Sequence, residues 1–326
     1  MTGRGDAPSD DGLDDAAAIF VAARQRLFGI AYRILGSAAD AEDVVQDAWV
    51  RWQTTDRSVV LSPQALLTTI TTRLAINVLQ SARSRRETYT GPWLPEPVDT
   101  SADPTLGAER AEALDVAVLV LLERLTPTER AAYVLREAFD YEYPEIARIL
   151  DTSPAATRQL VSRARRHLAT ERRIAVSAVS ATARRDLLAA FLAAARAGDV
   201  ERLEGLLAAD VVTRADSDGK VKQVARVAVT GRSKVARLLS AYAETFWEGI
   251  TVFPLEVNGD AALGMERDGE LVGVLVVKAS DEGVHELLWQ LNPAKLEPLR
   301  RSRAGHPTVA GAGEDATPGP PATPRS

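Results

Sequence analysis

Cysteine is absent from this chain, and histidine and methionine are scarce, with three and two copies among 326 residues. The lack of cysteine excludes disulfides, thiolate zinc sites and cysteine nucleophiles. No apolar run is long enough to cross a bilayer, and the acidic N-terminus lacks the pattern of a signal peptide. We therefore expect a cytoplasmic protein without membrane contacts, and we expect neither a metal nor another cofactor.

A general excess of positive charge is also missing, because the net charge is −6. This balance excludes a uniformly basic coat for nucleic acid. The charges are segregated instead: residues 158–173 hold six arginines against one acid, residues 73–87 hold four arginines against one acid, and residues 36–47 hold four acids and no base. Such segregation indicates separate surface patches with different partners.

The stretch from Leu125 to Leu168 predicts a helix followed by a helix-turn-helix. The first short helix of this motif covers residues 143–150, and residues 151–153 form the turn. Ser153 is a good N-cap residue, and Pro154 stands at the first helical position, where its missing N–H costs nothing. In such a motif the second helix is the one that lies on DNA.

The second helix of the motif has two distinct faces when residues are placed at about 100° intervals. The apolar face consists of Leu160, Val161, Ala164 and Leu168. The opposite face carries guanidinium, amide and hydroxyl groups from Arg158, Gln159, Ser162, Arg163, Arg165 and Arg166. Such groups read base edges in the major groove or grip phosphates. A basic face can also be merely solvated, but the turn, the cap and the preceding helix together favour nucleic-acid binding.

An acidic helix is predicted from about Ala38 to Gln53, after a helix over residues 16–35 that stops at Gly36. One face of the acidic helix is apolar and consists of Val45, Ala48, Trp49 and Trp52. The opposite face carries Asp43, Gln46 and Asp47. Taken alone, this acidic face is explained equally well as a solvated surface or as a functional one.

A long helix is predicted from the Ser62-Pro63 cap to about Arg86, with apolar residues such as Leu67 and Leu74 facing inward. Its outer side carries Thr69, Thr72, Arg73, Gln80 and Arg83, with Asn77 at the edge. A face that mixes amides, hydroxyls and arginines suits single-stranded bases and backbone better than a protein groove. The candidate DNA contacts on this helix are Arg73, Asn77, Gln80 and Arg83.

These motifs together resemble those of bacterial RNA polymerase sigma factors of the extracytoplasmic-function class (group 4), over residues 16–170. The segment AEDVVQDAWVRW is similar to the helix of region 2 that binds core polymerase, and this implies that Asp43, Gln46 and Asp47 meet a basic surface of the polymerase clamp. Residues 62–86 resemble the helix that melts and reads the downstream promoter element. Residues 125–168 resemble region 4.

The motif GPWLPEP, residues 91–97, narrows the resemblance to the sigma-J-like group, which carries a C-terminal SnoaL-like extension. In line with this, helices are expected over residues 181–207 and 233–245. Strands are expected over residues 221–230, 250–257, 261–265, 271–279 and 285–291. Two signatures of the group are present as NPAKL, residues 292–296, and as DSDGK, residues 216–220, which keeps one glycine of three and therefore has less backbone freedom.

The Pro-rich linker contains Trp93 and Leu94, two apolar residues that need a surface to dock on. The resemblance implies that the two signatures form or support that contact. The residues concerned are Trp93, Leu94, Asp216, Asp218, Gly219, Asn292, Pro293, Lys295 and Leu296. We expect the C-terminal domain to dock between two helical bundles and to regulate them, with the direction of the effect left open.

The expected fold is multidomain, with two all-α bundles and a C-terminal α+β cone-shaped domain of the SnoaL/NTF2-like kind. The expected boundaries are a disordered tail (1–15), sigma region 2 (16–88), a Pro-rich linker (89–105), sigma region 4 (106–172, with the helix-turn-helix at 143–169), the SnoaL-like domain (178–298) and a second disordered tail (299–326).

Three functions are compatible with the sequence. A sigma factor that binds core RNA polymerase and promoter DNA explains all the motifs, whereas a ligand-responsive helix-turn-helix regulator leaves residues 16–90 without a role. A cyclase- or isomerase-like enzyme needs an acid/base pair, and His285 is the single histidine in the body of the C-terminal domain. We therefore expect no catalytic residues and a regulatory C-terminal domain, which leaves a small-molecule ligand of that domain open.

Overall fold

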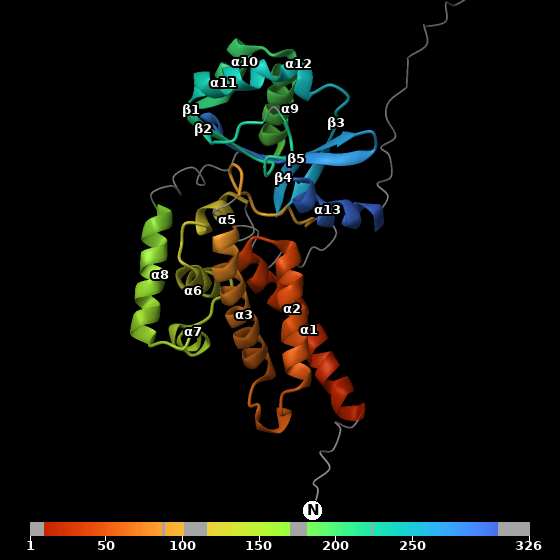
Figure 1. Ribbon diagram of the computed structural model, residues 1–326. Helices are drawn as coiled ribbons and strands as arrows, with labels where there is room; N and C mark the ends of the chain where they lie inside the picture. The colour runs from red at the N-terminus through yellow and green to blue at the C-terminus, as the bar shows by residue number, and fades with distance from the viewer. Residues whose placement is uncertain (1–9, 87–88, 101–115, 170–180, 223, 306–326) are drawn as a thin grey trace, which may run out of the picture.

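The computed structural model describes residues 10–86, 89–100, 116–169, 181–222 and 224–305. Two helical bundles lie side by side in the lower half of Figure 1, and an α+β domain lies above them. Within the described residues, no helix is both long and apolar enough to cross a membrane.

The first bundle consists of α1 (Asp10–Leu35), α2 (Ala38–Gln53) and α3 (Pro63–Arg86), with a short 3₁₀ turn η1 (Arg57–Val59) between the last two. Ser37 caps α2 by accepting a hydrogen bond from the backbone N–H of Asp40. The indole of Trp52 donates a hydrogen bond to the carbonyl oxygen of Ala16 over 3.0 Å. This contact anchors the early turns of α1, so residues 10–15, which were expected in a disordered tail, are helical instead.

The second bundle consists of α5 (Val116–Leu122), α6 (Pro127–Glu137), α7 (Tyr143–Ile149) and α8 (Pro154–Ala169). A capping box between Thr126 and Glu129 starts α6. The turn between α7 and α8 needs a left-handed residue, and Asp151 takes that conformation with φ of 53°. The predicted helix-turn-helix is confirmed, while the helical pattern expected from residue 106 to 115 lies outside the described residues.

The two bundles share one hydrophobic core. Buried residues of the first bundle, including Ile34 and Leu79, belong to the same cluster as Leu119, Ile146 and Val161 of the second. The expectation that the C-terminal domain lies between the bundles is therefore wrong. The bundles pack directly against each other, because α1 and α3 offer apolar side chains on more than one side.

The C-terminal domain begins with α9 (Ala181–Ala197) and α10 (Val200–Leu206) and continues with strands β1 (Leu207–Asp216) and β2 (Val229–Thr230). After α11 (Arg232–Ala241) and α12 (Ala243–Phe246) come β3 (Thr251–Val257), β4 (Asp260–Arg267), β5 (Glu270–Ser280), β6 (Gly283–Gln290) and α13 (Pro293–Gly305). The strand order is β2-β1-β6-β5-β4-β3, and β1 pairs with β6 in parallel.

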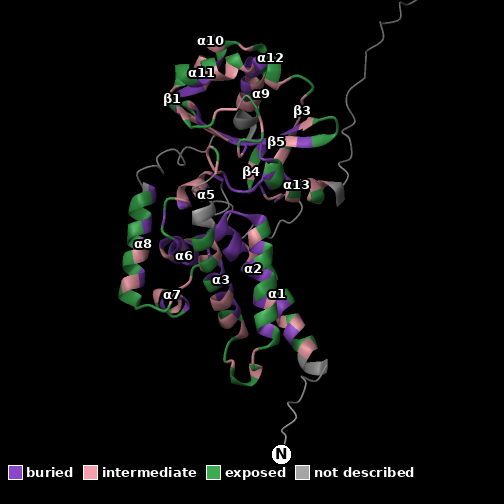
Figure 2. Cartoon of the chain, in the orientation of Figure 1, coloured by how far each residue is buried: buried purple, intermediate pink, exposed green. Residues whose placement is uncertain are grey.

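Both faces of this sheet are covered. Phe191, Val235 and Trp289 belong to the core cluster between the sheet and helices α9–α12. On the other face, Leu94 of the linker and Val116 of α5 pack with Leu288 of β6 and with residues of α13. The burial colours of Figure 2 accordingly show purple along the central strands. The α+β architecture expected from the sequence is confirmed.

One strand of this domain was not expected, and one expected strand is wrong over most of its length. The segment 207–216 was not expected as a strand, yet it forms β1, because its alternating apolar residues pair with β6 far along the chain. Among the described residues of the strand expected over residues 221–230, only Val229–Thr230 form a strand, which pairs with Val212 and Thr213 of β1.

The chain continues as helix α13 to Gly305, so the disordered tail expected from residue 299 is also wrong over its first residues. The tail was expected because the sequence after Pro298 is rich in Ala, Gly, Pro and Thr. Pro298 itself lacks the N–H that a helix uses. Tertiary contacts compensate for this loss. Leu296 and Leu299 are buried, and the side chain of Arg300 donates a hydrogen bond to the carbonyl oxygen of Leu271 over 2.9 Å.

Candidate functional site

The outer face of α8 forms an open basic groove of about 480 Å³. It is lined by Arg158, Gln159, Ser162, Arg163 and Arg166, and all five side chains are exposed. The groove faces outward because Val161, Ala164 and Leu168 bury the opposite side of the helix. The predicted split between an apolar and a basic face is thus confirmed, and Figure 2 shows the exposed side in green.

The arginines of α8 differ in their surroundings. Arg163 and Arg165 form ion pairs with Glu129 and Glu137 of α6, at 3.2 and 2.7 Å. The guanidinium of Arg158 lies over the ring of Tyr143 at 5.3 Å from its centroid. These contacts fix the direction of three long side chains before any ligand is bound, while Gln159, Ser162 and Arg166 point into the groove.

The acidic face of α2 is exposed as predicted. Asp43, Gln46 and Asp47 lie on its solvent side with Glu42 and Val50. Glu42 pairs with Arg24 of α1 at 2.6 Å. Within the described part of the chain, Asp43 and Asp47 make no ion pair, so their charges are available to a basic partner.

The predicted DNA-reading face of α3 is only partly open. Asn77 and Gln80 are exposed, whereas the side chain of Arg83 lies outside the described residues. Arg73 donates hydrogen bonds from Nε to the carbonyl oxygen of Ile149 over 2.8 Å and from Nη2 to that of Arg148 over 3.3 Å. Arg73 therefore binds the C-terminal end of α7 in this arrangement.

Thr72 was expected on the outer side of α3 and is fully buried instead. Helix α3 packs against α6 and α7 as well as against α1 and α2, so fewer of its positions are open to solvent than a two-faced helix would allow. The hydroxyl of Thr72 finds no hydrogen-bond partner among the described residues. An unsatisfied buried hydroxyl costs about 1–3 kcal/mol.

A second group of contacts joins the bundles near the turn between α6 and α7. The guanidinium of Arg26 lies 5.3 and 5.2 Å from the ring centroids of Phe139 and Tyr141. The hydroxyl groups of Thr68 and Tyr141 are hydrogen bonded over 3.0 Å. Together with the two hydrogen bonds of Arg73, these interactions form what we call the inter-bundle contact.

The linker is bound to the start of α2 through Glu96, a residue that the sequence analysis did not single out. Its carboxylate accepts hydrogen bonds from the backbone N–H groups of Ala38 and Ala39 and from the hydroxyl of Ser37, over 2.7, 3.2 and 3.0 Å. Burial raises the pKa of Glu96, although these hydrogen bonds act against the rise. A signal was present in the sequence, because Glu96 is the acidic residue of the motif GPWLPEP.

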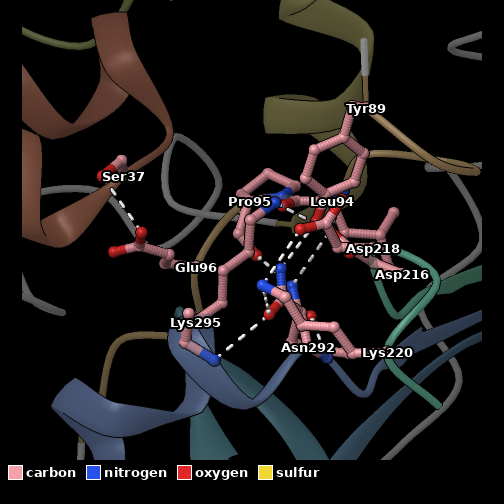
Figure 3. A network of polar contacts seen from close by, with 12 residues as sticks. Ser37, Tyr89, Leu94, Pro95, Glu96, Asp216, Asp218, Lys220, Asn292 and Lys295 are labelled. Carbon is pink, nitrogen blue, oxygen red and sulfur yellow. Dashed lines mark hydrogen bonds and ion pairs between the residues drawn. The ribbon is translucent and has the colours of Figure 1, made fainter. Parts of the chain in front are cut away.

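On its other side, the linker is bound to the C-terminal domain through Asp216 (Figure 3). One carboxylate oxygen of Asp216 accepts hydrogen bonds from the backbone N–H of Leu94 over 2.8 Å and from Nζ of Lys295 over 2.7 Å. Lys295 also donates to the carbonyl oxygen of Leu94 over 2.6 Å, and its Nζ lies 4.0 Å from the ring centroid of Trp93. The buried charges of Asp216 and Lys295 therefore neutralise each other, and both backbone polar groups of Leu94 are hydrogen bonded to this pair.

Tyr89 completes this contact and was missed by the sequence analysis. Its hydroxyl donates a hydrogen bond to the second carboxylate oxygen of Asp216 and accepts one from the amide of Asn292 over 2.8 Å. Burial and the neighbouring carboxylate of Asp216 raise the pKa of Tyr89 well above its usual value. The amide of Gln290 adds a hydrogen bond to the carbonyl oxygen of Pro95 over 3.1 Å.

The remaining residues of the two signatures support the same contact. Asp218 and Gly219 take left-handed conformations with φ of 50° and 68°, and the backbone of Gly219 lies against Thr90. Asp218 tolerates this conformation, which explains how the loop dispenses with further glycines. Pro293 is exposed at the start of α13, and Leu296 is fully buried beneath the linker.

A second anchor of the linker uses Asn258, also missed from the sequence. Its side-chain oxygen accepts a hydrogen bond from the N–H of Val98 over 3.0 Å, and its backbone N–H donates to the carbonyl oxygen of Val98 over 2.9 Å. Its amide also donates to the hydroxyl of Tyr32 over 2.6 Å. Through Asn258, the C-terminal domain thus contacts α1 directly.

The C-terminal domain contains a small apolar cavity of about 60 Å³ between the sheet and helices α11 and α12. Phe246, Trp247 and Trp289 form much of its wall, and the indole of Trp289 donates a hydrogen bond to the hydroxyl of Thr213 over 3.0 Å. A cavity of this size has room for a few water molecules. It gives the enzyme hypothesis no support.

His285 has two polar neighbours that the sequence did not reveal. Its Nε2 is hydrogen bonded to the hydroxyl of Ser280 over 2.7 Å, and its Nδ1 lies 3.6 Å from the carboxylate of Asp210. The hydroxyl of Ser280 also accepts a hydrogen bond from the N–H of Glu282 over 3.1 Å within the turn between β5 and β6. Ser280 and His285 are buried and do not line the cavity, so this group stabilises the turn.

Comparison with known proteins agrees with this arrangement. Residues 19–85 match the family described as Sigma-70 region 2, and residues 115–168 match Sigma-70, region 4. The chain is 42% identical over 234 residues to the ECF RNA polymerase sigma factor SigJ of Mycobacterium tuberculosis (strain ATCC 25618 / H37Rv), covering 71% of this chain and 74% of that protein. It is 29% identical over 297 residues to the probable ECF RNA polymerase sigma factor SigI of Mycobacterium tuberculosis (strain CDC 1551 / Oshkosh), covering 90% and 98%.

A solved structure resembles the whole arrangement. The crystal structure of the Mycobacterium tuberculosis extracytoplasmic function sigma factor SigJ superposes with a TM-score of 0.66 at 35% sequence identity. The match covers 86% of this chain and 98% of that chain, so it includes the C-terminal domain as well as the two helical bundles.

Proposed function

The chain belongs to the extracytoplasmic-function family of RNA polymerase sigma factors, and from this membership we propose that it is a promoter-recognition subunit whose downstream reading surface, on α3, is partly closed by its own packing. A sigma factor binds core RNA polymerase and promoter DNA and directs the start of transcription, without being an enzyme itself. The protein works where core polymerase works, in the cytoplasm. We call the present arrangement, in which Arg73 of α3 is hydrogen bonded to α7, the closed state. This hydrogen bond is the main observation that supports the proposal.

The basic groove on α8 is the upstream reading surface of this proposal. Gln159, Ser162 and Arg166 point into the groove, and Arg158 stands at its rim above Tyr143. Amide and guanidinium groups in this position bind base edges in the major groove. Arg163 and Arg165 would exchange their partners on α6 for DNA phosphates, which position the helix without reading sequence.

The downstream reading surface is the exposed side of α3. Asn77 and Gln80 contact unwound bases, and Arg83 follows on the same helix. Arg73 joins them fully only after it leaves the carbonyl oxygens of α7, because two of its five N–H donors, on Nε and Nη2, are held there in the closed state. The second bundle must therefore move away from α3 before the whole face can bind DNA.

The buried hydroxyl of Thr72 supports such a movement. It lies one turn from Thr68 along α3 and lacks a hydrogen-bond partner among the described residues. Opening would give it water as a partner and would remove part of the cost of separating the apolar surfaces. The closed and open arrangements can then differ by a small free energy, which core polymerase and promoter DNA supply.

We further propose that the C-terminal domain acts on the sigma regions within the same chain. Glu96 binds the start of α2, and two residues earlier Leu94 binds Asp216 and Lys295 of the C-terminal domain. A tethered domain works at about millimolar effective concentration, so this contact persists even if it is individually weak. A conformational change in the C-terminal domain would therefore be transmitted to α2, the proposed core-binding helix, through the three linker residues Leu94, Pro95 and Glu96.

The central test is binding to core polymerase and run-off transcription with α2 altered. Reversing the charge of both Asp43 and Asp47 to Lys should abolish capture of core enzyme and run-off product, because the acidic face acts as a set. The matched control is the same double reversal at Asp14 and Asp15 on the exposed side of α1, which should keep both activities. Normal capture by the Asp43 and Asp47 variant would rule out α2 as the core-binding surface.

A further inference from the structure

A groove of about 450 Å³ runs between the start of α2 and helix α13 of the C-terminal domain. The α2 wall is formed by Ala38, Ala39, Glu42 and Asp43. The linker residues Pro97, Val98 and Asp99 form its floor, and Pro298, Leu299, Arg301 and Ser302 of α13 form the opposite wall. In Figure 1, α13 accordingly lies beside the upper end of α2.

The groove is continuous with the acidic face of α2. Asp43 belongs to both, and Gln46 and Asp47 follow one turn further along the same helix. A partner that covers this face from Asp47 to Asp43 therefore arrives at the mouth of the groove. The far wall of that groove is contributed by the C-terminal domain, which lies outside the sigma regions.

The lining has a definite chemical preference. It carries three carboxylates, from Glu42, Asp43 and Asp99, against one guanidinium, from Arg301. Glu42 is paired with Arg24 of α1 at 2.6 Å and Asp99 accepts a hydrogen bond from Ser302 over 3.4 Å, so Asp43 is the carboxylate that makes no ion pair among the described residues. The rest of the lining includes apolar side chains such as Val98 and Leu299. A lysine or arginine of a partner can lay its aliphatic stem on such apolar groups and direct its charge to the carboxylates.

We infer that this groove receives a basic segment of core RNA polymerase, next to the surface that binds α2, so that the C-terminal domain contributes directly to core binding through α13. This inference rests on the proposed function, because the occupant is defined by its continuity with the acidic face of α2. Arg301 is the residue that opposes the incoming charge. It is exposed, and its one ion pair among the contacts described here is a loose one of 3.8 Å with Glu297.

The test measures the affinity of the full-length chain for core polymerase with two opposite changes on α13. Arg301→Glu should tighten binding about two- to fivefold, the size expected for an exposed ion pair, and the gain should fade at high ionic strength. Ser302→Arg should weaken binding to a similar degree, because it adds bulk and positive charge to the same wall. The matched controls are Arg237→Glu and Ser233→Arg on α11, which make the same charge changes away from the groove and should leave affinity unchanged.

The outcomes separate this inference from the proposed function. If Arg301→Glu left affinity unchanged or lowered it, the groove would not be a core contact. In that case, loss of binding in the Asp43 and Asp47 variant would still support the sigma function. If α13 and control variants shifted affinity equally, the effect would be one of net charge and the groove would again be excluded.

Discussion

The side-chain Nε of Arg73 lies 2.8 Å from the carbonyl oxygen of Ile149, so a predicted DNA contact of the first bundle is bonded to the helix-turn-helix of the second. The same side chain is therefore needed both for the hydrogen bond to α7 and for the proposed contact with DNA. While Arg73 binds α7, two of its five N–H donors are held there, and α3 stays in contact with the second bundle. If Arg73 contacts promoter DNA as proposed, it must first release these two carbonyl oxygens, so closure and full promoter reading compete at this residue.

The first prediction concerns the inter-bundle contact. Arg73→Ala removes two hydrogen bonds and should cost the closed state about 1 kcal/mol, a roughly fivefold change in the ratio of closed to open chains. Because the chain lacks cysteine, dyes can be attached to cysteines introduced at Val21 and Thr152. Energy transfer between them should fall in the variant and stay unchanged in the control Arg51→Ala. Equal transfer in all three proteins would show that Arg73 does not stabilise closure.

The second prediction concerns upstream promoter reading. Arg158→Ala and Gln159→Ala should each cost about 1–3 kcal/mol at one base pair and little at others, because bidentate base contacts are local. Arg163→Ala should weaken binding to all sequences alike, as the loss of a phosphate contact does. Binding to a set of single-base promoter variants measures both patterns. A uniform loss in the Arg158 and Gln159 variants would contradict direct readout by this face.

The third prediction concerns melting. Asn77→Ala should impair transcription from a duplex promoter much more than from a promoter with a pre-melted bubble, because extruding a base costs a few kcal/mol that single-strand contacts must offset. The two templates are compared in the same run-off reaction. Gln64→Ala, on the exposed first turn of α3, serves as the control and should affect neither template. Equal losses on both templates for Asn77→Ala would point to a folding defect.

The fourth prediction concerns the buried pair of Asp216 and Lys295. Lys295→Ala leaves a buried carboxylate without its cation and should destabilise the domain by about 3–5 kcal/mol, measured by thermal unfolding. Trp93→Ala withdraws the ring from the same Nζ and should change transcription in the same direction with a smaller effect on unfolding. If transcription rose in one variant and fell in the other, Trp93 would not act through the contact between the linker and the Asp216–Lys295 pair.

The fifth prediction concerns Glu96 and pH. Glu96→Ala removes the cap of α2 and should cost about 0.5–2 kcal/mol, whereas Glu96→Gln keeps an acceptor and should cost less. Because burial raises the pKa of Glu96 in the folded chain, protonation favours folding. The stability of the natural protein relative to Glu96→Gln should therefore be greatest below the usual pKa of glutamate and should fall as the pH rises through the raised value. Unfolding curves of both proteins between about pH 4 and pH 8 measure this difference.

The helices that carry the candidate surfaces were predictable from sequence because their signals are local. Ser153 and Pro154 start α8, and the spacing of Val161, Ala164 and Leu168 defines its buried side. The inter-bundle contact was not predictable, since the partners Arg73 and Ile149 are 76 residues apart. Neither local sequence contains a signal that identifies the other as its partner. The same limit hid β1, because β6, with which it pairs over most of its length, lies about 70 residues further along the chain.

In the linker, the sequence motif predicted some contacts correctly and missed others that depend on the three-dimensional fold. Trp93 and Leu94 were predicted to dock on the C-terminal domain because apolar residues avoid water, and they lie there. Glu96 was missed because a carboxylate in a linker is ordinarily solvated, and only the fold brings it to the open N–H groups of α2. Helix α13 was missed for a related reason, as the buried side chains that offset Pro298 have partners in distant strands.

The linker contacts also have a consequence for the order in which the protein is made. The partners of Leu94, Pro95 and Tyr32 in the C-terminal domain lie 122 to 226 residues further along the chain. Both helical bundles therefore leave the ribosome before Asn258, Gln290 and Lys295 exist, and at ordinary rates of synthesis the delay is on the order of ten seconds. During that interval Glu96 can already bind the start of α2, because its partners Ser37, Ala38 and Ala39 precede it in the chain. Leu94, Pro95 and Tyr32, by contrast, still wait for their partners in the C-terminal domain. If that domain regulates the sigma regions as proposed, each nascent copy passes through a brief unregulated stage, and the speed of elongation over the last third of the message sets how long that stage lasts.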